Sequence, residues 1–197
     1  CIFYGPPGVG KTTLARIIAN VCQGKFACLN AVSSGVADAK KIIDEAKREK
    51  AMFGIQTYLL LDECHRWSKA QSDCILSAVE EGTIVFIGST TENPYMAMTR
   101  AIVSRCKIFQ FTSLEKKDII CALERAIKDK QNGYGNLNLK ISDDALEQFC
   151  YASGGDVRNA LNSLELAVKS TPKNQNGEIE ITLEIAEQST QSKAMSL

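Results

Sequence analysis

Residues 5–13 read Gly-Pro-Pro-Gly-Val-Gly-Lys-Thr-Thr and match the pattern G-x-x-x-x-G-K-[ST]. They lie between an apolar run at 1–4 and a helical pattern that begins at Thr12. A strand, a glycine-rich turn and a helix in this order form a phosphate-binding loop, because backbone N–H groups and the positive end of the helix meet at the turn. A glycine-rich turn without a ligand is the alternative. The flanking strand and helix favour a nucleotide site.

Each residue type in this loop has a chemical role. The three glycines let the backbone turn back and aim its N–H groups at the β-phosphate, and the two prolines restrict the loop before a ligand arrives. Lys11 is expected to reach the β- and γ-phosphates, and Thr12 to place its hydroxyl on Mg²⁺. The predicted nucleotide-binding residues are Gly5, Pro6, Pro7, Gly8, Val9, Gly10, Lys11, Thr12 and Thr13.

The composition restricts the class of protein. A chain of 197 residues can hold one full domain and a smaller second one. Its 23 basic and 23 acidic residues cancel, so a DNA contact has to come from a local patch or from segments outside this sequence. The eight cysteines show neither a C-x-x-C pair nor the clustered spacing of zinc ligands. We interpret them as small core hydrophobes of a reducing cytosol.

Targeting signals are missing from the sequence. No apolar stretch approaches the roughly 18 residues of a membrane span, and no secretory signal pattern is present. We therefore expect a cytoplasmic or nucleoid location and no membrane partner. The sequence begins at Cys1, without an initiating Met and directly in the first strand. We expect it to be a fragment without an upstream segment that can carry adenine contacts.

Strand-like runs alternate with helical patterns in the first part of the chain. The runs are residues 1–4, 25–30, 57–62, 83–89 and 107–111. This βαβ order is typical of a parallel sheet with helices on its faces. Between the runs, helical patterns occupy 36–46 and 69–81, and Ser68 is placed to cap the second.

The strand signal stops after Phe111. Helical patterns follow at about 115–130, 142–152 and 156–169, with a fourth from Thr182. Polar stretches at 131–138 and 170–177 are expected to be loops. We predict an α/β P-loop core over residues 1–112 and a small all-α domain over 113–197.

Two carboxylates, Asp62 and Glu63, follow the apolar run at 58–61. Ligands bind at the carboxyl edge of a parallel sheet, where this run ends. Asp62 is placed to hold Mg²⁺ through its water shell, and Glu63 to orient or deprotonate the water that attacks the γ-phosphate. A strand that ends in an acidic turn is the alternative. The phosphate loop upstream favours the catalytic interpretation.

His65 is the only histidine, and Asp-Glu-Cys-His at 62–65 resembles the D-E-x-H box of superfamily 2 helicases. Such helicases need a second recombinase-like domain with arginine-rich motifs. The rest of the chain is too short and too helical for one. We expect His65 to have a structural or coupling role near the nucleotide and not to be the base.

Three further residues are candidates for contacts to the γ-phosphate. Thr91 follows the fourth strand and can hydrogen-bond the phosphate or the attacking water, although a capped turn is the alternative. Arg105 precedes the fifth strand, where an arginine can stabilise transition-state charge in a neighbouring subunit. Arg158 begins a helix of the second domain and can couple the position of that domain to nucleotide state. Each of the two arginine signals is weak alone, because isolated arginines are mostly solvated.

Taken in order, these motifs resemble an AAA+ ATPase of the clamp-loader clade. The segments that carry the resemblance are residues 5–13, Leu-Leu-Leu-Asp-Glu-Cys-His-Arg at 59–66, Gly-Ser-Thr-Thr-Glu-Asn-Pro at 88–94, Ser-Arg-Cys at 104–106 and Gly-Gly-Asp-Val-Arg-Asn-Ala-Leu-Asn at 154–162. Within that clade, residues 29–36, 66–71 and 90–94 look like the replication-associated recombination protein A family, which is related to the eukaryotic Werner-helicase-interacting protein. Thr-Glu-Asn-Pro is the most family-specific of these segments.

The resemblance implies a doubly wound sheet of strand order 5-1-4-3-2, a helical lid and an oligomer with its nucleotide between subunits. It implies ATP and Mg²⁺ as cofactors. The residue roles that it implies are Walker A for Lys11 and Thr12, Walker B for Asp62 and Glu63, sensor 1 for Thr91, a trans-acting finger for Arg105 and sensor 2 for Arg158, with Thr12 and Asp62 at the metal.

Members of this family are DNA-dependent ATPases that act at stalled or gapped replication forks. The resemblance therefore implies single-stranded, forked or gapped DNA, single-stranded-DNA-binding protein and recombination factors as partners, and a tetramer for the full-length protein. The C-terminal region that builds the tetramer is not in this sequence. We expect an isolated fragment to bind ATP but to hydrolyse it poorly, because Arg105 then has no neighbour to serve.

Other functions share these motifs. A clamp-loader subunit and a Holliday-junction branch-migration motor have the same parts, although Thr-Glu-Asn-Pro favours the recombination-protein family. A scaffold that uses nucleotide only for assembly is a different class. Such scaffolds usually lose the Walker lysine or the glutamate, and this chain keeps both Lys11 and Glu63.

Overall fold

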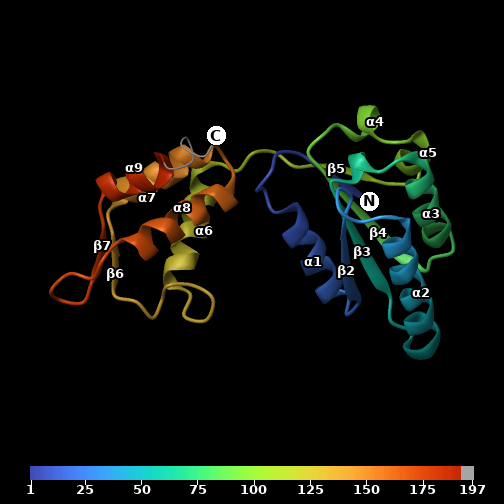
Figure 1. Ribbon diagram of the computed structural model, residues 1–197, viewed down its shortest axis with the longest axis horizontal. Coiled ribbons are helices and arrows are strands. Elements are labelled where there is room, and N and C mark those ends of the chain that lie inside the picture. Colours follow the sequence, from blue (N-terminus) through green and yellow to red (C-terminus); the bar gives the residue numbers. More distant parts are fainter. Residues whose placement is uncertain (192–197) are drawn as a thin grey trace. The chain divides into compact units, whose positions relative to one another are not determined.

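The computed structural model describes residues 1–191, in which the chain forms two compact units, Cys1–Thr112 and a second unit that begins at Ser113. The first unit contains a parallel sheet with helices on both faces (Figure 1). Its strands are β1 (Ile2–Tyr4), β2 (Lys25–Asn30), β3 (Thr57–Asp62), β4 (Ile84–Thr90) and β5 (Ile108–Gln110). Their order is β2-β3-β4-β1-β5, so the predicted order is confirmed.

Helices cover the two faces of this sheet unequally. Helix α1 (Lys11–Val21) packs on one face, where Ala15 joins Phe3, Leu60 and Ile87 in a small core. Helices α2 (Val36–Phe53) and α3 (Lys69–Glu80) pack on the other face around a larger core. Three short helices complete the unit: η1 (Cys64–Arg66), α4 (Pro94–Ala97) and α5 (Arg100–Val103).

Local sequence explains how these helices begin and end. Ser68 caps α3, because its backbone N–H donates to Gln71 Oε1 at 2.9 Å and its hydroxyl accepts from the Gln71 N–H at 3.4 Å. Helix α2 extends to Phe53, seven residues beyond the predicted range, and stops at Gly54 in the left-handed conformation. The apolar stripe ends earlier, but residues 47–53 are mostly good helix formers.

The second unit is mainly helical. Its helices are α6 (Lys116–Lys128), α7 (Asp143–Ser153), α8 (Val157–Ser170) and α9 (Leu183–Gln191). They enclose a core centred on Leu123, Phe149 and Leu164, each fully buried.

One feature of this unit corrects the sequence analysis, which placed no strand after Phe111 and expected an all-α domain. Strands β6 (Leu139–Ile141) and β7 (Ile179–Ile181) pair in parallel as a second sheet. Each strand has three residues, with a charged residue between two apolar ones, which is too short for a detectable alternation.

The interpretation of the cysteines as core residues is only partly correct. Cys64 and Cys150 are buried, whereas Cys22, Cys28 and Cys121 are exposed. Burial raises the pKa of the Cys64 thiol to about 12, so this side chain stays protonated at neutral pH. Within residues 1–191, no group of His, Cys, Asp and Glu has the arrangement of a metal cluster, and no helix is long and apolar enough to cross a membrane.

Candidate functional site

The strand register brings several predicted site residues to one edge of the first sheet. Tyr4, which precedes the glycine-rich loop, is the partner of Thr90 at the end of β4. Leu61, which precedes Asp62, is the partner of Gly88 in β4. The Gly5 N–H donates to the Thr90 carbonyl at 3.1 Å. The loop, the two carboxylates and the segment after β4 therefore leave the same carboxyl edge.

The loop has the backbone conformation of an anion site. Gly5, Gly8 and Gly10 have φ angles of 147°, 68° and 92°, in the range that disfavours side chains. Gly10 is the N-cap of α1, so the unpaired N–H groups and the positive dipole end of this helix face the loop. Such an arrangement binds phosphate groups.

Lys11 adds a full positive charge to this loop. Its Nζ donates to the carbonyl oxygens of Gly5 at 2.8 Å and Pro6 at 2.7 Å, and the residue is buried. Thr12 is half-buried and Thr13 is exposed. The ammonium group is thus held against the loop backbone, next to the amides that can bind phosphate.

Asp62 and Glu63 lie between β3 and η1. Asp62 is the last residue of β3, and its Oδ1 accepts the Glu63 N–H at 3.2 Å. Glu63 adopts the left-handed conformation with φ 54°, which is unusual for a residue with a side chain. Backbone strain of this kind costs on the order of 1–3 kcal/mol and concentrates at functional sites. The turn directs the chain from the strand into η1 immediately after the two carboxylates.

Three other residues, His65, Thr90 and Glu92, form a cluster of polar contacts beside Glu63, and the sequence did not predict these contacts. His65 Nδ1 lies 2.7 Å from Thr90 Oγ1. His65 Nε2 lies 3.3 Å from Glu92 Oε1 and 3.6 Å from Glu63 Oε2. Thr90 Oγ1 also accepts the Glu92 N–H at 3.0 Å. The residues that contact His65 are determined by the pairing of β3 with β4 in the sheet. No local sequence pattern predicts that pairing.

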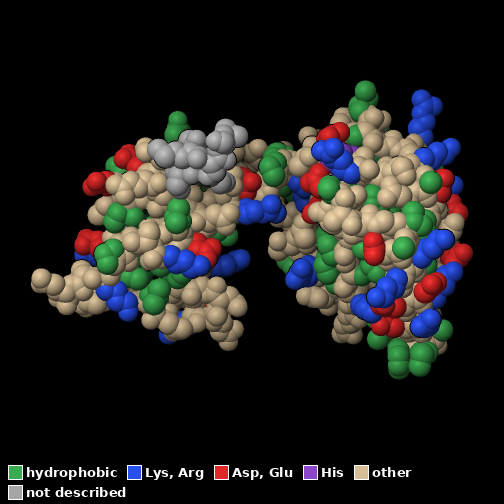
Figure 2. Space-filling view, in the orientation of Figure 1, with side chains coloured by type: hydrophobic (Ala, Val, Ile, Leu, Met, Phe, Trp, Pro, Cys, Tyr) green, Lys and Arg blue, Asp and Glu red, His purple; other side chains and the backbone are tan. Residues whose placement is uncertain are grey.

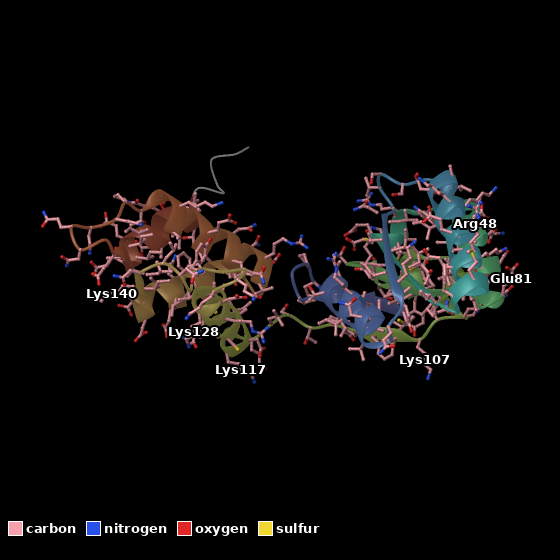
Figure 3. All side chains as sticks on the ribbon, turned by 90° about the horizontal axis from the view of Figure 1, so that it is seen from below. Arg48, Glu81, Lys107, Lys117, Lys128 and Lys140 are labelled. Atoms are coloured by element: carbon pink, nitrogen blue, oxygen red, sulfur yellow. The ribbon has the colours of Figure 1, made fainter. Side chains whose placement is uncertain are left out.

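Thr91 and Arg105 occupy different edges of the sheet. Thr91 is the first residue after β4 and is exposed at the carboxyl edge. Arg105 precedes β5, so in a parallel sheet it lies toward the opposite, amino edge. Its Nε donates to Glu80 Oε1 at 2.6 Å and its Nη1 to the Ala101 carbonyl at 3.0 Å. Lys107, two residues later, projects away from the unit into solvent (Figure 3).

Arg158 belongs to the second unit. Asp156 caps α8 there by accepting the N–H groups of Arg158 at 2.9 Å and Asn159 at 3.2 Å. The Arg158 side chain is exposed. Its predicted contact with nucleotide remains a prediction.

Comparison with known families follows the division of the chain. The ATPase family associated with various cellular activities (AAA) matches residues 1–114. The chain belongs to the AAA family of ATPases. It is therefore an ATP hydrolase by class. The AAA C-terminal domain matches residues 135–197 of this AAA chain.

Several relatives of this AAA chain are named for replication-associated recombination. Replication-associated recombination protein A of Bacillus subtilis (strain 168) is 47% identical over 195 residues, which are 99% of this chain and 45% of the relative. The protein of the same name from Escherichia coli (strain K12) is 40% identical over 84% of this chain and 37% of its own length. ATPase WRNIP1 of Dictyostelium discoideum is 40% identical over 88% of this chain and 20% of its own length. The predicted resemblance is confirmed, and the chain spans less than half of each of these relatives.

A solved structure of a branch migration motor has the same fold. The RuvB Holliday junction branch migration motor of Thermotoga maritima matches with a TM-score of 0.75 and 24% identity, over 97% of this chain and 60% of that structure. At this identity the match concerns the fold alone.

Substitution of Gly5 by Ala tests the loop of this AAA chain. A Cβ at this position would lie 2.2 Å from the Phe111 carbonyl oxygen, and the φ of 147° is strained for alanine. We expect Gly5→Ala to weaken ATP binding by at least about 10-fold and to destabilise the unit by roughly 1–3 kcal/mol. Equilibrium binding of a fluorescent ATP analogue and thermal unfolding measure both effects.

Gly35→Ala is the matched control for this substitution. Gly35 has φ −110°, and a Cβ there meets no atom within 4 Å. We expect unchanged ATP binding in this control and, because Gly35 is the N-cap of α2, a loss of stability of at most about 1 kcal/mol. Equal behaviour of the two variants would contradict the close packing inferred at Gly5.

Proposed function

We propose that this chain is the ATPase part of a protein that hydrolyses ATP in a DNA-dependent manner during replication-fork maintenance, recombination and repair. One observation supports the ATPase site above all: the glycine-rich loop, Asp62 and Glu63 leave the same edge of the sheet. The cellular process rests on 47% identity to a protein named for replication-associated recombination. A clamp-loader subunit and a branch-migration motor remain alternatives.

The ATP phosphates are proposed to lie along residues 5–13, with Lys11 and the N-terminus of α1 providing positive charge. Mg²⁺ fits the donors present, because the Thr12 hydroxyl and the Asp62 carboxylate are hard oxygen ligands at this edge of the sheet. When bound, the ion would neutralise charge that develops on the phosphates. Glu63 is the proposed residue that orients or deprotonates the attacking water, and Thr91 the residue that contacts water or γ-phosphate.

Arg105 is proposed to complete the site of a neighbouring subunit. The loop follows β1 and Arg105 precedes β5, so the two lie toward opposite edges of one sheet. An arginine in this position can stabilise transition-state charge in a second copy. The proposal therefore includes self-association, as a tetramer in the full-length protein. Arg158 is proposed to report nucleotide state to the second unit.

DNA is the proposed regulator of turnover, as single-stranded, forked or gapped DNA. On the face shown in Figure 2, Lys and Arg side chains of the first unit are interspersed with Asp and Glu. Together with the balanced net charge, this favours a local DNA contact or one formed by several subunits over a broad basic surface. Single-stranded-DNA-binding protein and recombination factors are proposed partners by family resemblance.

ATP turnover measured with different DNA structures tests this function. We expect single-stranded, forked or gapped DNA to raise the ATPase rate several-fold above blunt duplex. At one fixed salt concentration the non-specific phosphate contacts are common to all of these DNA molecules, so a difference in rate reports recognition of the DNA structure. Stimulation only by a Holliday junction would favour a branch-migration motor. Turnover that no DNA changes would contradict DNA dependence and leave the ATPase assignment intact.

A further inference from the structure

His65 connects the proposed catalytic carboxylate to the neighbouring strand. Its side chain is only 5% exposed, although it carries two polar nitrogens. One nitrogen faces the Thr90 hydroxyl at 2.7 Å, and the other faces Glu92 at 3.3 Å and Glu63 at 3.6 Å. The imidazole is therefore enclosed by polar groups from the end of β3 and the end of β4.

The two nitrogens have different tasks. In the neutral ring with its proton on Nε2, Nδ1 accepts from the Thr90 hydroxyl and Nε2 donates toward the carboxylates. The separations of 3.3 Å to Glu92 and 3.6 Å to Glu63 are both slightly longer than a typical N–H···O hydrogen bond. A shift of a few tenths of an ångström would therefore bring the Nε2–H group within hydrogen-bond distance of either carboxylate.

The backbone adds a reason for this arrangement. The Glu63 side chain extends from the left-handed turn and is partly exposed, so its carboxylate keeps one orientation only if another side chain holds it. Thr90 is buried and tied by its hydroxyl to the Glu92 N–H at 3.0 Å. His65 thus has a fixed anchor on β4 and a carboxylate partner that is proposed to act on water.

We propose that His65 is a positioning residue for ATP hydrolysis: it holds the Glu63 carboxylate through Nε2 and ties it, through Thr90, to the segment that carries Thr91. This inference rests on the proposed role of Glu63. Because Glu63 and Glu92 share Nε2, the Glu63 carboxylate has two positions. In one it is bound to the His65 ring, and in the other it is released. Movement of the segment after β4 would then change how Glu63 is held.

Two substitutions of His65 by amide side chains distinguish the contribution of Nδ1 from that of Nε2. Asparagine places its amide near Nδ1, so His65→Asn keeps the bond to Thr90 and loses the carboxylates. Glutamine reaches the position of Nε2, so His65→Gln keeps the carboxylate contact. Because a hydrogen bond to a charged group accounts for roughly 10- to 100-fold in a rate when it acts only in the transition state, we expect about 10-fold lower kcat for Asn and at most about 3-fold for Gln. KM for ATP is expected to stay within about 2-fold in both, because ATP binding uses the loop.

Thr90→Val tests the anchor. It removes the hydroxyl that faces Nδ1 at 2.7 Å. We expect it to lower kcat in the wild-type background and to add little in the His65→Gln background, where that contact is already lost. Arg66→Ala, an exposed neighbour in η1, is the control and should leave turnover unchanged. Thermal unfolding of every variant identifies loss of fold.

The outcomes separate this inference from the proposed function. Wild-type kcat in His65→Asn would overturn the positioning role. Equal losses in Asn and Gln, together with a lowered unfolding temperature, would also overturn it, because they would indicate a purely structural residue. If Glu63→Gln turned over ATP at the wild-type rate, the proposed role of Glu63 itself would fail. An inactive Glu63→Gln with a fully active His65→Asn would reject only the inference about His65.

Discussion

Glu63→Gln is expected to lower ATP turnover by about 10²- to 10⁴-fold, the usual contribution of a general base. Glutamine has the same shape as glutamate, but it cannot take a proton from water. Glu63 is half-buried at the carboxyl edge of the sheet, next to Asp62 and outside the glycine-rich loop. The Kd for ATP should therefore remain within about 3-fold of the wild-type value, because the Lys11 charge and the backbone amides of the loop are unchanged.

Single-turnover hydrolysis and equilibrium ATP binding measure these two effects separately. Glu81→Gln is a suitable control, because Glu81 lies on the surface after α3 and pairs with Lys47 at 3.1 Å (Figure 3). We expect wild-type turnover in this control. Rapid hydrolysis by Glu63→Gln would contradict the assignment of Glu63 as the general base and would indicate that another residue has this role.

In the assembled full-length protein, Arg105→Ala is expected to lower kcat by about 10³-fold or more while ATP binding is retained, as for arginine fingers supplied by a neighbour. Arg105 forms an ion pair with Glu80 at 2.6 Å, but this pair is too weak to keep Arg105 from acting in a neighbouring subunit. Both side chains are about half exposed, and such surface ion pairs contribute about 0–1 kcal/mol. Arg105 can therefore leave Glu80 and bind a phosphate group of the ATP that is bound to another subunit.

Mixing two inactive variants tests whether Arg105 acts in trans. Subunits with Arg105→Ala keep Glu63, and subunits with Glu63→Gln keep Arg105. A mixed assembly contains some interfaces with both intact residues, so we expect part of the activity to return. No recovery on mixing, with assembly verified, would argue that Arg105 serves its own subunit or no site. Lys107→Ala, two residues away and exposed, is the control.

The sequence predicts this fold well where a residue's role is local. Glycine spacing at the loop predicted the P-loop, and the alternation of strand-like runs with helical patterns predicted a parallel sheet covered by helices, because both patterns follow from backbone geometry. The strand order came from family resemblance. Strands β6 and β7 were missed because three residues carry almost no periodic signal.

Contacts between side chains that are distant in the sequence could not be predicted from local patterns. Sequence placed Thr91 at the γ-phosphate, but it did not show that Thr90, the preceding residue, is buried against His65. It also did not show that Glu80 pairs with Arg105, because 25 residues separate them. Contacts of this kind depend on strand register and helix packing, which tertiary structure sets.

The placement of the loop and Arg105 toward opposite edges of one parallel sheet has a consequence for assembly. If Arg105 acts in trans, each copy donates an arginine at one end and accepts one at the other. Such a head-to-tail contact is heterologous and cannot be satisfied by a two-fold symmetric dimer. Copies then either close into a ring, with every site complete, or form an open helical array that leaves one terminal site without its arginine.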